Sequence, residues 1–301
     1  MAISTLQAKI RSKKNPVVLS LSPEPSSLPD FLLQRAENEP GDPAQALAKA
    51  CRSFCQGLLE ALQPVIPAVS FDSGLFCALG APGVAAMQSL MQLARELGYY
   101  VLLDWMRADL PPAAQALAQA CFGTCSVGKK TFTPYACDGV MLNAYLGSDA
   151  VKPFTRFCAE GKNVFVLARS SNSSARELQD LLSGDRVVHQ AIADLAMRWS
   201  TDLIGKSGYS EVGVCMSSTN ALALSKLRER YPQLFFLVSG PGVREAQKAF
   251  DRLGRGAALL AGENILYAFR RKNAPGEEYQ KYALEAAERL REQVLGCVNI
   301  Y

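Results

Sequence analysis

The stretch GYYVLLDWMRADLPPAAQALAQACFG, residues 98–123, contains one strand, one turn and one helix of the predicted fold. Its apolar run Tyr100–Asp104 has the length and composition of a buried strand. Pro111 then begins a helical segment, since the first N–H group of a helix has no partner within the helix and proline lacks that group. The stretch therefore predicts a βα unit.

The same alternation of a short apolar run and a longer helical segment recurs along the chain. The predicted strands are residues 17–22, 65–71, 100–104, 138–143, 163–168, 212–215, 234–238 and 257–261. The predicted helices are residues 43–62, 82–97, 111–121, 149–160, 186–199, 220–231, 243–253 and 277–295. Eight such units match a closed (β/α)8 TIM barrel better than an open, doubly wound α/β sheet. We predict one domain over residues 1–301, with an N-terminal helix at about 1–15 and the barrel at about 16–296.

Composition excludes several classes of protein. The 301 residues are 49% hydrophobic, which is enough for a substantial core. The net charge of +4, with 32 basic and 28 acidic residues, argues against nucleic acid or an anionic membrane as a partner. The most basic stretch, residues 9–14, is predicted to be a solvated helix. No apolar segment reaches the roughly 18 residues of a membrane span, so we expect a cytoplasmic protein.

The cysteines and the single histidine argue against a metal centre. The nine cysteines form no C-x-x-C pair, and those in apolar segments are expected to be reduced core residues: Cys77, Cys137, Cys158 and Cys215. The pairs Cys51/Cys55 and Cys121/Cys125 have no nearby histidine and are weak candidates for metal ligands. His189 is the only histidine, which excludes sites that need two, and we expect it to have no catalytic role.

In barrels of this kind, functional side chains lie at the carboxyl ends of the strands. The third strand ends at Asp104, and Asp109 follows five positions later. Two carboxylates that leave a strand for a loop can converge on one ligand. Asp109 can equally cap the helix that begins at Pro111, and the spacing alone favours neither interpretation.

The segment Asp-x-Met-x-x-Asp at residues 104–109 resembles the Asp-x-Lys-x-x-Asp signature of orotidine 5'-monophosphate (OMP) decarboxylases, except at the lysine. Other segments resemble the longer, bacterial (type 2) branch of this family: FCALG (76–80), ARELG (94–98), NAYLGSD (143–149), VFVLARSSN (164–172), LQDL (178–181), FLVSGPG (236–242) and ILYA (265–268). They occur in the family's order. The resemblance implies a (β/α)8 barrel, a homodimer formed through the barrel mouth, and a decarboxylation in pyrimidine biosynthesis that uses no cofactor.

The resemblance also implies a catalytic array of alternating lysines and aspartates, of which only the aspartates are matched. Asp104 and Asp109 match the two aspartates, and the second would reach across a dimer interface. Ser70 and Met106 stand at the positions of two lysines, one of which would protonate the carbanion left by carbon dioxide. Methionine cannot donate a proton, and general acid catalysis is typically worth about 10²–10⁴-fold. Without these cations, the pKa of one aspartate is expected to rise.

The substrate-binding positions are changed as well. Those implied by the resemblance are Ser22, Ser171, Asn172, Gly240, Gly242, Arg244 and Glu263. Glu263 replaces the arginine that grips the phosphate, so a negative charge stands in place of a bidentate donor. Arg244 matches a phosphate-contacting glutamine and is expected to compensate in part. The glycine pair and the Ser-Asn loop are also explained by ordinary turns.

Three hypotheses about function remain open. We favour a degenerate homologue that keeps the barrel and the dimer, binds a pyrimidine nucleotide monophosphate, and has a ligand-binding or regulatory role. The second hypothesis is an active decarboxylase whose lysine comes from an unaligned position such as Lys129, Lys130 or Lys206. The third is an enzyme of different chemistry on the same scaffold, because barrels change reaction through their loops.

Overall fold

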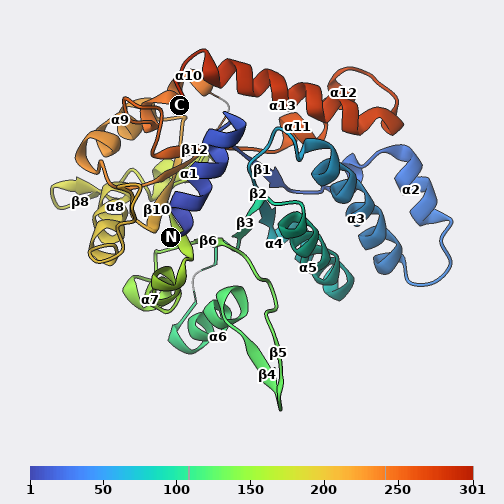
Figure 1. Ribbon diagram of the computed structural model, residues 1–301, viewed down its shortest axis with the longest axis horizontal. Coiled ribbons are helices and arrows are strands. Elements are labelled where there is room, and N and C mark those ends of the chain that lie inside the picture. Colours follow the sequence, from blue (N-terminus) through green and yellow to red (C-terminus); the bar gives the residue numbers. More distant parts are fainter. Residues whose placement is uncertain (108, 241, 301) are drawn as a thin grey trace.

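Eight parallel strands close into a barrel in the computed structural model of the chain (Figure 1), in the order β1-β12-β11-β10-β7-β6-β3-β2. The structure describes residues 1–107, 109–240 and 242–300; Ala108 and Pro241, in two of the predicted strand-end segments, and Tyr301 lie outside the described residues. The strands are β1 (Val17–Leu21), β2 (Ala68–Asp72), β3 (Tyr100–Asp104), β6 (Gly139–Leu142), β7 (Asn163–Arg169), β10 (Val212–Ser217), β11 (Phe236–Ser239) and β12 (Ala257–Ala261). The predicted barrel is confirmed.

Helices cover the outside of the barrel (Figure 1). Those that follow the strands are α3 (Pro43–Leu62), α5 (Gly80–Glu96), α6 (Pro111–Phe122), α7 (Ser148–Thr155), α8 (Val188–Trp199), α9 (Ala221–Arg230), α10 (Val243–Ala246) and α13 (Tyr279–Leu295). The helix predicted at 243–253 is too long, because α10 gives way to a 3-10 turn. Asp251 accepts hydrogen bonds from the backbone N–H groups of Leu253 and Arg255, both at 2.8 Å, and such side-chain bonds compete with a helix.

The N-terminal helix α1 (Ala2–Lys13) closes one end of the barrel. Its residues Ile3 and Leu6 are fully buried, and the N–H group of Ile3 donates to the carboxylate of Glu211 at 2.9 Å, just before β10. Lys9 donates to the carbonyl of Gly98, just before β3, at 2.6 Å. The basic stretch is therefore helical as predicted, but one face of the helix is buried. Because α1 covers the amino ends of the strands, the opposite, carboxyl end is the open one.

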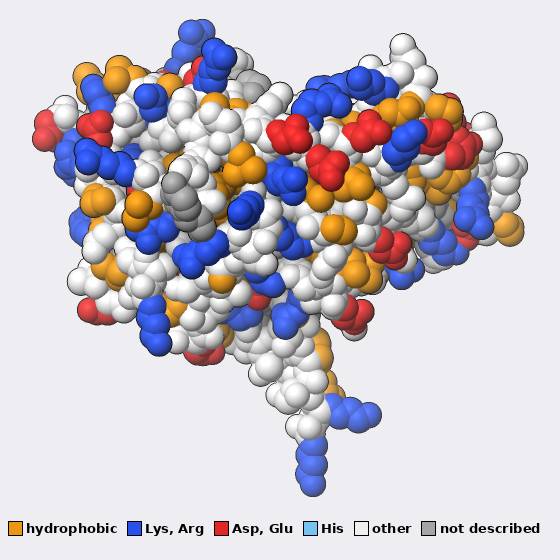
Figure 2. Space-filling model, turned by 45° about the horizontal axis from the view of Figure 1, so that its top comes forward, with side chains coloured by type: hydrophobic (Ala, Val, Ile, Leu, Met, Phe, Trp, Pro, Cys, Tyr) orange, Lys and Arg blue, Asp and Glu red, His pale blue; other side chains and the backbone are white. Residues whose placement is uncertain are grey.

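Several elements were not predicted from the sequence. They are helices α2 (Asp30–Glu37), α4 (Ser73–Cys77), α11 (Glu263–Leu266) and α12 (Ala268–Arg271), and two hairpins, β4 (Cys125–Val127) with β5 (Lys130–Phe132) and β8 (Leu182–Ser183) with β9 (Arg186–Val187). The β4–β5 hairpin projects from the body, and basic side chains lie at its tip (Figures 1 and 2).

The predicted core cysteines are buried with one exception. Cys137, Cys158 and Cys215 are buried, whereas Cys77 is exposed. Cys77 is the last residue of the short helix α4, and the buried residues of that helix are Ser73 and Phe76. No described helix is long and apolar enough to cross a membrane.

Candidate functional site

A cavity of about 500 Å³ opens among the carboxyl ends of the barrel strands. Five of the residues singled out in the sequence contribute to its wall: Ser22, Asp104, Met106, Ser171 and Glu263. They lie in or after β1, β3, β7 and β12, so the fold brings together positions that are up to 241 residues apart (22 to 263). This is the end of the barrel that α1 leaves open.

Other predicted site residues lie elsewhere. Ser70, which stands at the position of a family lysine, is buried below the cavity, with its Oγ 3.5 Å from the Sδ atom of Met141, a cavity residue. Asn172 is exposed outside the cavity wall, and its Oδ1 accepts a hydrogen bond from Ser170 at 2.5 Å. Arg244 is exposed on α10 and does not line the cavity.

The glycine turn after β11 lines a second, adjoining cavity. Gly240 and Gly242 contribute to this space of about 370 Å³, which shares Gly262 and Glu263 with the first cavity. Gly240 has a φ of +110°, and a Cβ atom there would lie 2.6 Å from the Oγ of Ser218. A glycine is therefore needed at position 240 for the turn itself, whether or not the turn holds a ligand.

Asp104 has no cationic partner in the described part of the chain. In the strand pairing it stands opposite Asp72, the last residue of β2. Burial, and then the charge of Asp72, raise the pKa of Asp104 to about 7. The sequence predicted a raised aspartate pKa, but the nearby carboxylate is Asp72 rather than Asp109. At neutral pH the carboxyl group of Asp104 is partly protonated.

The backbone after β3 directs Met106 into the cavity. The N–H groups of Trp105 and Met106 both donate to the carbonyl of Met141, at 3.2 and 2.9 Å, and Met106 has a φ of +38°. This left-handed conformation costs a non-glycine residue about 1–2 kcal/mol. Arg107 turns away and forms an ion pair with Asp109 at 2.9 Å. Arg107 therefore does not replace the missing cation.

Asp104→Asn is expected to stabilise the protein more at about pH 8 than at about pH 5. The folded-state pKa of about 7 lies above the ordinary value of 3.8, so stability falls as the pH rises through this window. A difference of about three pKa units corresponds to at most ~4 kcal/mol. We expect a stabilisation of about 2–4 kcal/mol at pH 8 and about half of that or less at pH 5, where the carboxyl group is ionised only in the unfolded state. Urea unfolding at both pH values measures it, with the exposed Asp202→Asn as control. An equal effect at both pH values would contradict the shifted pKa.

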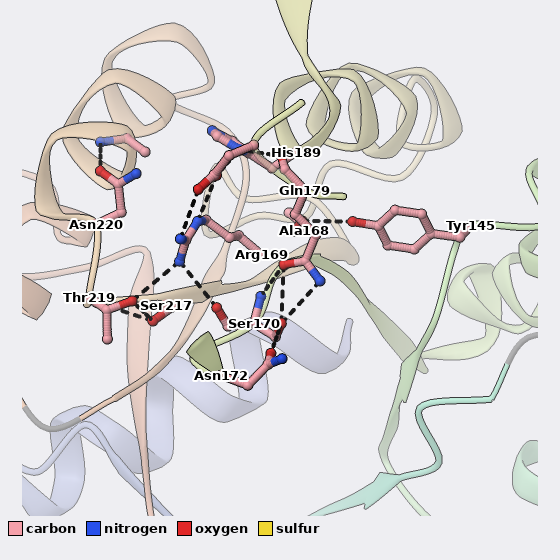
Figure 3. Close-up of polar contacts among 12 residues, drawn as sticks. Tyr145, Ala168, Arg169, Ser170, Asn172, Gln179, His189, Ser217, Thr219 and Asn220 are labelled. Atoms are coloured by element: carbon pink, nitrogen blue, oxygen red, sulfur yellow. Dashed lines mark hydrogen bonds and ion pairs between the residues drawn. The ribbon is translucent and has the colours of Figure 1, made fainter. Parts of the chain in front are cut away.

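A partly buried polar network holds the loop after β7 (Figure 3). The Arg169 guanidinium binds Asp180 through two bonds of 2.9 and 3.0 Å, and this pairing lowers the pKa of Asp180. The backbone N–H of Ser170 donates to Gln179 Oε1 at 2.8 Å. Ser170 lines the cavity, so the network fixes part of the cavity wall. This network was not predicted, because nothing in the LQDL segment shows that Gln179 and Asp180 fold back onto β7.

His189 belongs to this network rather than to the cavity. Its Nδ1 atom lies 2.9 Å from the carbonyl oxygen of Gln179 and 3.3 Å from the Asp180 carboxylate. Burial lowers the pKa of His189, so the ring is largely neutral at pH 7. These contacts give His189 a structural role.

The described residues of the cavity form no cluster of metal ligands, and its one cysteine is a weak nucleophile. Within residues 1–107, 109–240 and 242–300, no group of three or more His, Cys, Asp and Glu side chains is arranged to hold a metal ion. Cys215 lines the cavity, but burial raises the pKa of its thiol well above the ordinary value. The thiol is therefore protonated at neutral pH and is a weak nucleophile.

Known proteins similar to this chain are OMP decarboxylases. The orotidine 5'-phosphate decarboxylase of Caldicellulosiruptor bescii is 26% identical over 296 residues, which is 96% of each protein. That of Rhodopirellula baltica is 26% identical over 301 residues, 97% of this chain and 98% of the relative. No family model matches the chain.

Solved structures similar to this chain include an OMP decarboxylase and a longer protein, a UMP synthase. The OMP decarboxylase of Leishmania donovani superposes with a TM-score of 0.71 at 25% identity. The match covers 97% of this chain and 99% of that protein. The UMP synthase of the same organism has a TM-score of 0.75 at 25% identity; the match covers 99% of this chain and 56% of that protein. The resemblance expected from the sequence is thus confirmed over nearly the whole chain.

Proposed function

We propose that this OMP decarboxylase-like barrel has lost efficient decarboxylation and serves as a ligand-binding or regulatory protein in pyrimidine metabolism. One observation carries the proposal: among the described residues that line the cavity there is no lysine, arginine or histidine. A decarboxylation without a cofactor depends on protein cations to stabilise the carbanion and return a proton. Assay of the purified protein with OMP tests this, and turnover above background would contradict it.

The principal alternative, an active decarboxylase with an unaligned lysine, gains no support from the placement of the three candidates. Lys129 and Lys130 lie at the tip of the projecting β4–β5 hairpin (Figure 1). Lys206 is exposed and follows Gly205, whose surroundings include Met1 of the N-terminal segment, at the closed end of the barrel. None of the three lines the cavity.

The proposal includes a homodimer formed through the barrel mouth. Asp109, the residue that the resemblance assigns to a neighbouring subunit's site, is paired with Arg107 and does not line its own chain's cavity. An exposed hairpin of two strands is only marginally stable in water by itself, which favours a covering partner. Light scattering of the purified protein measures the oligomeric state.

Glu263→Arg is expected to tighten the binding of uridine 5'-monophosphate by roughly tenfold or more. The substitution removes a negative charge from the shared rim of the two cavities and supplies a bidentate donor for phosphate. Calorimetric titration measures the affinity. Glu263→Gln separates the two effects, because it removes the charge without adding a donor. Unchanged affinity in both variants would place the phosphate elsewhere.

A further inference from the structure

The charged groups at the cavity are all acidic. Glu24, Asp104 and Glu263 line it, and Asp72 lies beside Asp104 in the neighbouring strand. No described residue of the wall is basic, and Ala108 and Pro241, which the structure does not describe, carry no charge. A ligand in this cavity therefore meets a negative potential from several sides.

Only one of these carboxylates, that of Glu263, has a basic partner among the described residues. Arg271 lies 3.9 Å from Glu263, and both side chains are more than half exposed, so solvent weakens the pair. Asp104 is less exposed and has no such partner among the described residues. Its carboxylate is the strongest single site for a positive group on a ligand.

The rest of the wall combines hydroxyl groups with an apolar floor. Ser20 and Ser22 have their Oγ atoms 3.2 Å apart, and Ser171 and Ser239 contribute hydroxyls from other strands. Met106, Met141, Leu167 and Leu260 add apolar surface. Hydroxyls both donate and accept, so such a wall suits a flat apolar ring that bears hydroxyl or amide groups.

We propose that the ligand of this cavity carries a positive charge, as an ammonium group on a nucleoside-like body, and that phosphomonoesters are excluded. The nucleoside-like body of the ligand is inferred from the proposed function. The charge of the ligand is inferred from the cavity itself. An ammonium group pairs with Asp104, whereas a phosphate dianion is repelled by each carboxylate of the wall and finds no cation there.

Three uridine derivatives whose 5' substituent is cationic, neutral or anionic test the proposal: 5'-amino-5'-deoxyuridine, uridine and uridine 5'-monophosphate. Calorimetric titration at about pH 8, where the carboxyl group of Asp104 is largely ionised, is expected to give the tightest binding for the amine and the weakest for the phosphate, with roughly a hundredfold between them. Asp104→Asn should abolish the advantage of the amine over uridine. Asp202→Asn, the same change at an exposed site outside the cavity, should leave the order unchanged.

The outcomes distinguish failure of the inference about charge from failure of the proposed function. If the phosphate or uridine binds most tightly, the inference about charge is overturned and the proposed function stands. If the amine keeps its advantage in Asp104→Asn, the assignment of Asp104 as its partner is overturned. If none of the three binds, both the inference and the proposed ligand-binding role fail. Thermal melting of both variants verifies that each is folded.

Discussion

The combined variant Ser70→Lys, Met106→Lys and Glu263→Arg is expected to decarboxylate OMP measurably, whereas the unmodified protein stays at the background rate. A carbanion that forms beside Asp104 now meets Met106, which has no proton to give. A positioned general acid is typically worth about 10²–10⁴-fold, so we expect a gain of at least about 100-fold over background. Chromatographic detection of uridine 5'-monophosphate measures the product.

Single restorations should not suffice. Met106→Lys alone still faces the missing cation at position 70 and the negative charge at Glu263, and groups that act as a unit are strongly non-additive. Ser70 lies below the cavity against Met141, so a lysine there must displace that side chain to reach Asp104. Circular dichroism must show that the triple variant is folded.

Robust turnover by the unmodified protein that is lost in Asp104→Asn would mean that an unrecognised group donates the proton. Lys129→Ala and Lys130→Ala then show whether the hairpin of a second copy supplies it. Unaltered turnover in both would exclude the hairpin.

The fold was predictable because each unit carries its own local signals. The strands β3 and β12 have the predicted bounds, and α3 has its predicted bounds as well, with Asp42 as its N-cap. Buried parallel strands are apolar on both faces, so their runs stand out in the sequence. The helix predicted at 243–253 was too long because a side chain, that of Asp251, competes with the helix for backbone N–H groups.

The site was predictable only in part, because cavity walls depend on register and on how loops fold back. The positions of Asp104 and Met106 followed from the motif. The pairing of Asp72 with Asp104 depends on the register of β2 and β3, which no short motif reveals. The depth of Ser70 depends on the same register, and the Arg169–Asp180 pair depends on an 11-residue return of the chain.

A buried cation that the sequence did not reveal lies at the other end of the barrel. Arg228 of α9 donates to the carbonyl groups of Ala249, Leu234 and Gly256 at 2.6, 2.9 and 2.7 Å. Its guanidinium lies 4.2 Å from the centre of the Phe236 ring. Burial lowers the pKa of Arg228 to about 10, so the group remains charged at neutral pH. Arg228 thus joins α9 to the segments that lead into β11 and β12.

Arg228→Met is expected to lower the free energy of unfolding by about 3–5 kcal/mol, because several buried carbonyl groups lose their donor at once. The free energy of unfolding of Arg228→Lys should lie between those of the unmodified protein and Arg228→Met, since one ammonium group cannot reproduce the planar fork of the guanidinium. Urea unfolding measures the loss, and Lys226→Met, the same change of charge at an exposed position of α9, should cost less than about 0.5 kcal/mol. A loss in Arg228→Met no larger than this would show that the carbonyls find other donors. Because these contacts lie at the amino ends of the strands, the folded variant should keep the ligand preference of the cavity at the carboxyl ends.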